Sequence, residues 1–195
     1  NLILNDDLII TPLQEVERDR VEQEIEETIF NTKKSDYDET PLLLGERVGL
    51  IDTINTKHDK LEYLITKMRA LDWDEYEIPL DSCNAEFKRA SKSIYDMAFY
   101  NLAYQWEGDS NAAKNLMPIV SSFVTDSSLL TMYGEITKNE FVHARGYAET
   151  AKFSFDDPNE AIKKIHAIKD LGKRMHTVSR VFYLAKRAAH LYELG

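Results

Sequence analysis

The chain has few of the residues that build turn-rich proteins. Its 195 residues include seven glycines and five prolines, and long stretches contain neither residue. Because β-sandwiches and β-barrels need frequent turns, this scarcity argues against an all-β fold. We also find no run of alternating apolar and polar residues long enough to predict a sheet. The sequence therefore predicts an all-α protein.

Two further absences bear on the cellular environment. The single cysteine, Cys83, excludes an internal disulfide and is typical of a reducing compartment, where it acts most simply as a small apolar residue. No apolar run approaches the length of a membrane span, and the first residues have no basic segment before their apolar ones. We therefore expect a soluble, cytoplasmic protein with no membrane partner.

Positive charge is also scarce. The chain has 24 lysines and arginines against 34 acidic residues, which gives a net charge of −10. The basic residues are scattered rather than gathered into a stripe, so nucleic acid is not an expected partner. With 43% hydrophobic residues, the chain is long enough for one substantial core or for a large piece of a bigger one.

Helical periodicity and turn residues divide the chain into expected elements. Residues 12–30 predict an acidic, amphipathic, peripheral helix, and residues 31–56 predict an extended arm. An apolar patch in that arm, Leu42 to Leu44, is expected to pack on a neighbouring helix. Asp157 followed by Pro158 is a strong helix start. The remaining helices are expected at 57–71, 85–109, 111–124 (broken near Pro118), 126–153, 158–172 and 173–194.

Polar residues of the metal-ligand type occupy core positions of the helix expected at 126–153. Glu140 and His143 are three residues apart and point the same way, which is half of a carboxylate-bridged dinuclear metal site. Burying an ionised carboxylate costs several kcal/mol unless it is paired, and a metal provides that pairing. The apolar register that contains them runs, at steps of three and four residues, through Tyr133, Ile136, Glu140, His143 and Tyr147.

The simpler alternative is that the Glu-x-x-His pattern occurs here by chance and binds no metal. Glu-x-x-His also occurs on solvated helix faces and around core histidines that are satisfied by other partners. Tyr147, one turn beyond His143, would then be ordinary core packing. A second stripe, on the helix expected at 85–109, ends at a further carboxylate, Asp109. Its other members are Phe87, Ala90, Ile94, Met97, Asn101 and Gln105.

The spacing of several segments resembles that of one known family, the small, radical-generating subunit of class I ribonucleotide reductase. Asp109 precedes Glu140 by 31 residues, and the Trp-x-x-x-Glu-apolar pattern begins at Trp73. The segments that carry the resemblance are residues 41–45, 73–78, 101–110, 139–147 and 157–158. The resemblance covers roughly residues 40–195, which it identifies as the N-terminal portion of a ferritin-like helical bundle. Residues 1–39 would be an N-terminal extension.

The resemblance implies a role for each matching residue. Asp109, Glu140 and His143 would be ligands of one metal centre, Tyr147 the radical tyrosine, and Trp73 the aromatic residue that relays an electron. The cofactor would be dinuclear iron or, alternatively, a manganese–iron pair, since oxygen ligands with one imidazole suit both metals. The chain would then take part in reducing ribonucleotides to deoxyribonucleotides, with the reductase large subunit as a partner. Trp106 is interpreted as a packing residue.

The second half of the family's metal site is missing from the sequence. The residues three positions before the other histidines, His58, His166, His176 and His190, are Asn55, Lys163, Lys173 and Arg187. We therefore expect a split or truncated small subunit, whose partial bundle and metal site are completed by a complementary C-terminal chain in a dimeric assembly. Two alternatives remain open. Two copies of this chain would together supply the required ligands, or the chain is a non-catalytic, structural or regulatory remnant.

Overall fold

The computed structural model describes residues 41–45 and 50–193, and this part of the chain is helical. The prediction of an all-α protein is confirmed. Within the described residues, the strand-like pairing is a single isolated bridge between Leu43 and Val124. The elements are α2 (Asp59–Ala70), the 3₁₀ helix η1 (Glu75–Glu77), α3 (Cys83–Arg89), α4 (Lys92–Val120), α5 (Ser127–Ser154), α6 (Pro158–His166) and α7 (Lys169–Glu193).

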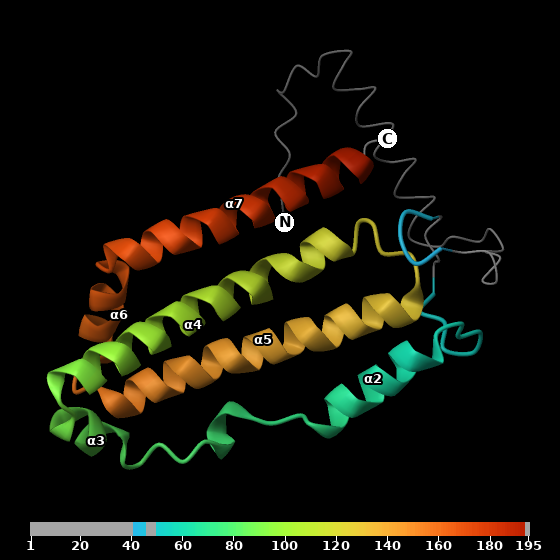
Figure 1. Ribbon diagram of the computed structural model, residues 1–195. Coiled ribbons are helices and arrows are strands. Elements are labelled where there is room, and N and C mark those ends of the chain that lie inside the picture. Colours follow the sequence, from blue (N-terminus) through green and yellow to red (C-terminus); the bar gives the residue numbers. More distant parts are fainter. Residues whose placement is uncertain (1–40, 46–49, 194–195) are drawn as a thin grey trace, which may run out of the picture.

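The longer helices lie side by side in one layer, in the order α2, α5, α4 and α7 (Figure 1). The short helices α3 and α6 lie together at one end of this layer, where both contact α5. Helices α4 and α5 form an antiparallel hairpin that makes the largest interface. The architecture is consistent with a ferritin-like helical bundle, as predicted. None of the described helices is both long and apolar enough to cross a membrane.

The start of α5 follows directly from the sequence. Asp126 is its N-cap, and the carboxylate accepts a hydrogen bond from the backbone N–H of Leu129 at 2.7 Å. An acceptor at this position satisfies an N–H that has no partner within the helix. The predicted helix over 126–153 is therefore confirmed within one residue at each end.

The prediction of a single helix over 85–109 is wrong. The chain forms α3 to Arg89, becomes extended at Ala90 and Ser91, and starts again as α4. The Ser91 hydroxyl caps α4 by accepting a hydrogen bond from the N–H of Ile94 at 3.4 Å. The predicted break near Pro118 is absent as well, because α4 holds that proline inside its last turn and ends at Val120.

The predicted helix over 158–172 is also two helices. Its start is confirmed, since the Asp157 carboxylate accepts hydrogen bonds from the N–H groups of Asn159 at 2.9 Å and Glu160 at 3.4 Å. It ends at His166, and α7 begins at Lys169 after a two-residue turn. The apolar spacing continues across this turn, because side chains on both sides of it pack into the same core. The sequence pattern therefore contains no sign of the turn.

That core lies between α4, α6 and α7. Trp106 packs against the edge of this core, as expected for a packing tryptophan. On a different side of α4, Ile94 is 55% exposed and Met97 is 68% exposed. These two residues belong to the stripe that ends at Asp109, so that stripe is open in the described part of the chain. The buried members of the core are Phe99, Ala103, Ala161, Ile165, Leu171 and Met175.

The described part of the predicted arm contacts the connection between α4 and α5. The N–H of Leu44 donates to the carbonyl of Phe123 at 2.7 Å, and the N–H of Thr125 donates to the carbonyl of Leu42 at 3.0 Å. The leucine side chains 42–44 remain between 38% and 60% exposed. The prediction that they pack on a helix face is therefore wrong, because backbone pairing holds the segment instead. The predicted helix over 12–30 and the extension over 1–39 lie outside the described residues.

Candidate metal centre

The structure brings together the three ligand-type residues singled out in the sequence. Asp109 comes from α4, and Glu140 and His143 come from successive turns of α5. One ligand atom from each residue lies within 4.8 Å of the others. The Nδ1 atom of His143 is 3.6 Å from a carboxylate oxygen of Asp109 and 3.5 Å from one of Glu140. Among the described residues, no other group of three such side chains converges in this way.

The charge of this cluster favours a cation. The side chains of Asp109, Glu140 and His143 are 27%, 23% and 39% exposed. Among the described residues, no lysine or arginine forms an ion pair with either carboxylate. Two partly buried carboxylates side by side repel each other unless a positive charge lies between them. Their oxygens and the imidazole nitrogen therefore fit a divalent transition metal such as iron or manganese.

Tyr147 lies one turn beyond His143 and faces the same carboxylates. Burial of the phenol, followed by the negative charge of Asp109, a hydrogen bond to Asp109 and the charge of Glu140, raises the pKa of Tyr147 to about 12. The phenol is therefore protonated at neutral pH. The hydroxyl therefore keeps a proton that it can donate to a neighbouring carboxylate oxygen.

Trp73 reaches the site from the segment between α2 and α3. Its ring centroid is 5.8 Å from that of His143, and the two ring planes are inclined by 31°. A bland alternative would place Trp73 beneath the arm that contains Leu42 to Leu44. That arm contacts the start of α5, roughly 30 Å along the helix from the turn that Trp73 contacts, given the rise of an α-helix. Residues 41–45 of the arm therefore do not cover Trp73.

Sequence analysis missed the residues that hold the Trp73 segment on α5. Glu75 is 5% exposed, and its carboxylate accepts a hydrogen bond from Nε of Arg145. Gly146 is buried, and a Cβ atom added to it would lie 3.2 Å from the indole of Trp73. Glu75 is one of four acidic residues within positions 72–77, so the local sequence resembles a solvated loop. No local pattern identifies a pairing across 70 residues.

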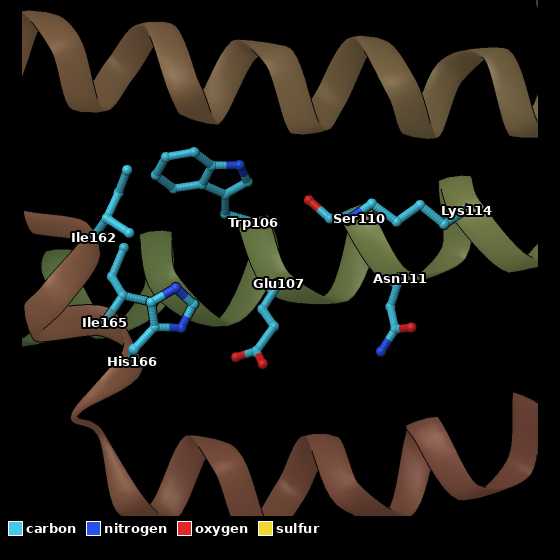
Figure 2. Close-up of a pocket in the computed structure, with 8 residues that line it drawn as sticks. All are labelled: Trp106, Glu107, Ser110, Asn111, Lys114, Ile162, Ile165 and His166. Carbon is cyan, nitrogen blue, oxygen red and sulfur yellow. The ribbon is translucent and has the colours of Figure 1, made fainter. Parts of the chain in front are cut away.

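A separate cavity of about 310 Å³ lies along α4, beside α6 and α7 (Figure 2). Trp106 forms part of its wall with Ile162 and Ile165, while Glu107 and Asn111 point toward α7. None of the predicted metal ligands lines it. This arrangement accounts for Trp106 as a packing residue and sets it apart from the candidate metal centre.

Comparison with known proteins supports the resemblance found in the sequence. No family model matches the chain. Among curated proteins, the ribonucleoside-diphosphate reductase subunit beta of Enterobacteria phage T4 is 26% identical over 155 residues, which is 80% of this chain. The chain is a homologue of a ribonucleotide reductase small subunit. It spans 40% of the length of that relative. The matching ribonucleotide reductase subunit and the helical fold together confirm the suspected relationship, while the split or truncated state and the ligand roles remain predictions.

Proposed function

We propose that the chain contributes one half of a dinuclear metal centre, and the radical tyrosine, to a ribonucleotide reductase small subunit. In this role it would help to start the reduction of ribonucleotides to deoxyribonucleotides. One observation carries the proposal: Asp109, Glu140 and His143 converge from two helices, and the charges of Asp109 and Glu140 both act on the phenol of Tyr147. The similarity to the phage T4 subunit supports it.

The residues of the cluster divide the work between binding and proton transfer. Asp109, Glu140 and His143 would hold one metal of an iron pair, or of a manganese–iron pair. The bound metals would supply the oxidising power that removes one electron from Tyr147. The phenol proton would move from the Tyr147 oxygen to the carboxylate of Asp109, because this carboxylate is the acidic group that acts most strongly on the phenol.

Trp73 would carry the electron between this site and the outside of the subunit. Its indole lies against the ring of the ligand His143 and comes from a segment that is external to the α4–α5 hairpin. An indole is far easier to oxidise than an aliphatic or phenyl side chain, which suits it to this task. The oxidised Tyr147 would accept an electron from the reductase large subunit through Trp73, so the oxidising equivalent would pass to that subunit.

The second metal needs ligands from outside the described residues. We propose that a complementary C-terminal small-subunit chain covers the open stripe of α4 and supplies the second carboxylate helix and the second Glu-x-x-His. The exposed apolar side chains of Ile94 and Met97, which precede Asp109 on this stripe, are suited to burial against such a chain. A second copy of the same chain is the competing way to complete the site.

The proposal is tested by metal stoichiometry. The chain alone should bind iron or manganese weakly, and a mixture with the complementary chain should bind two metals tightly per pair. Elemental analysis after gel filtration measures both values, and the mass of the eluted species separates a mixed pair from a homodimer. Two tightly held irons on a monomeric chain would contradict the half-site.

Matched variants identify the ligands. Asp109→Asn and His143→Ala should abolish tight binding in the mixture, since each removes a ligand atom. His176→Ala provides a control, because His176 is an exposed histidine on α7, away from the cluster. Absence of tight metal binding in every combination would instead favour a non-catalytic helical protein.

A further inference from the structure

We propose that Glu75, Arg145 and Gly146 form a dock that fixes the indole of Trp73 against His143. They act as positioning residues, since none of them belongs to the metal-ligand cluster. The part of this inference that concerns electron transfer rests on the proposed function. The contacts themselves are features of the chain and can be tested without a metal.

The first component of the dock is Gly146, which has no side chain. A Cβ atom there would meet Cη2 of Trp73 at 3.2 Å and Cδ1 of Ile78 at 3.4 Å. Contacts near 3.2 Å are tighter than packed carbon atoms normally allow. Glycine therefore lets both ends of the 73–78 segment approach the α5 backbone. This approach occurs between His143 and Tyr147, at the turn where the candidate site is built.

The second component is the ion pair in the middle of the same segment. The Glu75 carboxylate is buried beneath Arg145, whose Nε donates to it and whose Nη2 donates to the hydroxyl of Tyr76 at 3.3 Å. A buried carboxylate without this partner would be strongly disfavoured. The pair therefore anchors the segment to α5 one residue before the glycine. Trp73 thus lies against Gly146, while Glu75 and Tyr76 contact Arg145.

A short capped helix makes the segment rigid between these contacts. The Asp74 carboxylate accepts from the N–H of Tyr76 at 2.9 Å, and the Glu77 carboxylate accepts from the N–H of Asp74 at 3.0 Å. These reciprocal bonds form a capping box around η1. Because η1 is rigid, fixing Glu75 and Ile78 on α5 also fixes the direction in which Trp73 projects.

Fixed placement matters for a relay residue. Electron transfer between two rings weakens steeply as their separation grows, and displacements of about 1 Å in a reacting pair are costly in enzymes. The segment between α2 and α3 contains no helix apart from η1 among its described residues. The ion pair between Lys138 and Asp72 also ties the start of the segment to α5, and the dock then fixes the indole itself beside His143.

The test uses Trp73 as its own fluorescent reporter. In a Trp106→Phe background, Trp73 is the sole tryptophan of the chain. Gly146→Ala and Arg145→Gln should each shift its emission to longer wavelength and increase its quenching by acrylamide, because the indole leaves the α5 surface. Far-UV circular dichroism should remain that of the parent, since alanine and glutamine both favour helix.

Two control variants match these substitutions, one on α5 and one on α2, at a contact with α5. Gly134→Ala changes an α5 glycine whose added Cβ would meet nothing within 4 Å. Arg69→Gln breaks an ion pair of the same type, in which Nε of Arg69 contacts the carboxylate of Glu135 on α5. The arginine and glutamate side chains are 57% and 13% exposed in this pair, against 60% and 7% for Arg145 and Glu75. Neither control should change Trp73 emission. Identical spectra for Gly146→Ala, Arg145→Gln and their parent would overturn the dock.

Manganese separates this inference from the proposed function. Mn²⁺ bound at the cluster should quench Trp73 strongly in the parent, and it should lose much of that effect in the two dock variants at equal Mn²⁺ occupancy. Occupancy is measured from the electron paramagnetic resonance of free Mn²⁺, in the presence of the complementary chain. If the parent binds no Mn²⁺, the proposed function fails, whereas the emission shifts of the metal-free chain still decide the dock.

Discussion

At the scale of single residues, Tyr147 offers a clear separation of chemistry from folding. Tyr147 is half-buried on α5, and its phenol is influenced by the charges of Asp109 and Glu140. Removing its one side-chain oxygen atom therefore deletes the redox group and leaves the helix and the three predicted ligands in place.

We predict that Tyr147→Phe abolishes the tyrosyl radical signal of the completed, oxygen-exposed complex. The phenyl ring cannot give up a proton and an electron at an accessible potential. Metal content should barely change, because the three ligand side chains remain. Electron paramagnetic resonance and elemental analysis on the same sample measure the two quantities. A radical signal that persists in the variant would assign the radical to another tyrosine.

A second prediction concerns the two tryptophans. Trp73→Phe should leave the metal site assembled but suppress nucleotide reduction, because phenylalanine is much harder to oxidise. Trp106→Phe should act through packing, with a loss of about 1 kcal/mol in the free energy of unfolding and little loss of turnover per assembled site. The assay is nucleotide reduction with the large subunit and the complementary chain present. Equal turnover of Trp73→Phe and wild type at equal metal content would remove Trp73 from the pathway.

Helix spacing together with the family resemblance selected the residues that converge. Asp109, Glu140 and His143 follow from helix periodicity and from the resemblance. The dock was not predictable in the same way, because Glu75 and Arg145 meet through tertiary packing. Gly146 gives no local signal either, since its role depends on an indole that approaches from a different segment.

At the scale of elements, helix caps were predictable and helix breaks were harder. Asp126 and Asp157 identified the starts of α5 and α6 through their side-chain acceptors. The breaks around Ala90 and Ala167 were missed, because apolar spacing continues across both and neither contains glycine or proline. Apolar periodicity indicates which side chains reach a core. A tight turn between two helices can preserve that periodicity, so the pattern alone does not reveal the turn.

We predict that Asp157→Ala lowers the free energy of unfolding by about 1 kcal/mol, since it removes the acceptor for two N–H groups at the start of α6. Urea denaturation followed by circular dichroism measures the change. Asp81→Ala serves as a control, because Asp81 is exposed and precedes no helix as an N-cap. An equal effect of both substitutions would attribute the loss to charge rather than to capping.

At the scale of the whole molecule, the four-helix layer leaves one stripe of α4 open. We predict that the double substitution of Ile94 and Met97 by serine leaves the stability of the chain nearly unchanged, since these side chains are 55% and 68% exposed. The same substitution should weaken binding of the complementary chain, measured by calorimetry. Val181→Ser on α7, at a position that is 61% exposed, is the control. Unchanged affinity would place the partner on a different face.

The α4–α5 hairpin has a consequence for the order of assembly. It carries all three predicted ligands and Tyr147 on two helices joined by the short connection 121–126. Contacts between neighbouring segments form early in folding, because little chain entropy is lost in closing a short loop. The three predicted ligands and Tyr147 can therefore come together before any more distant segment packs on the hairpin, so the geometry of the cluster is set by local folding.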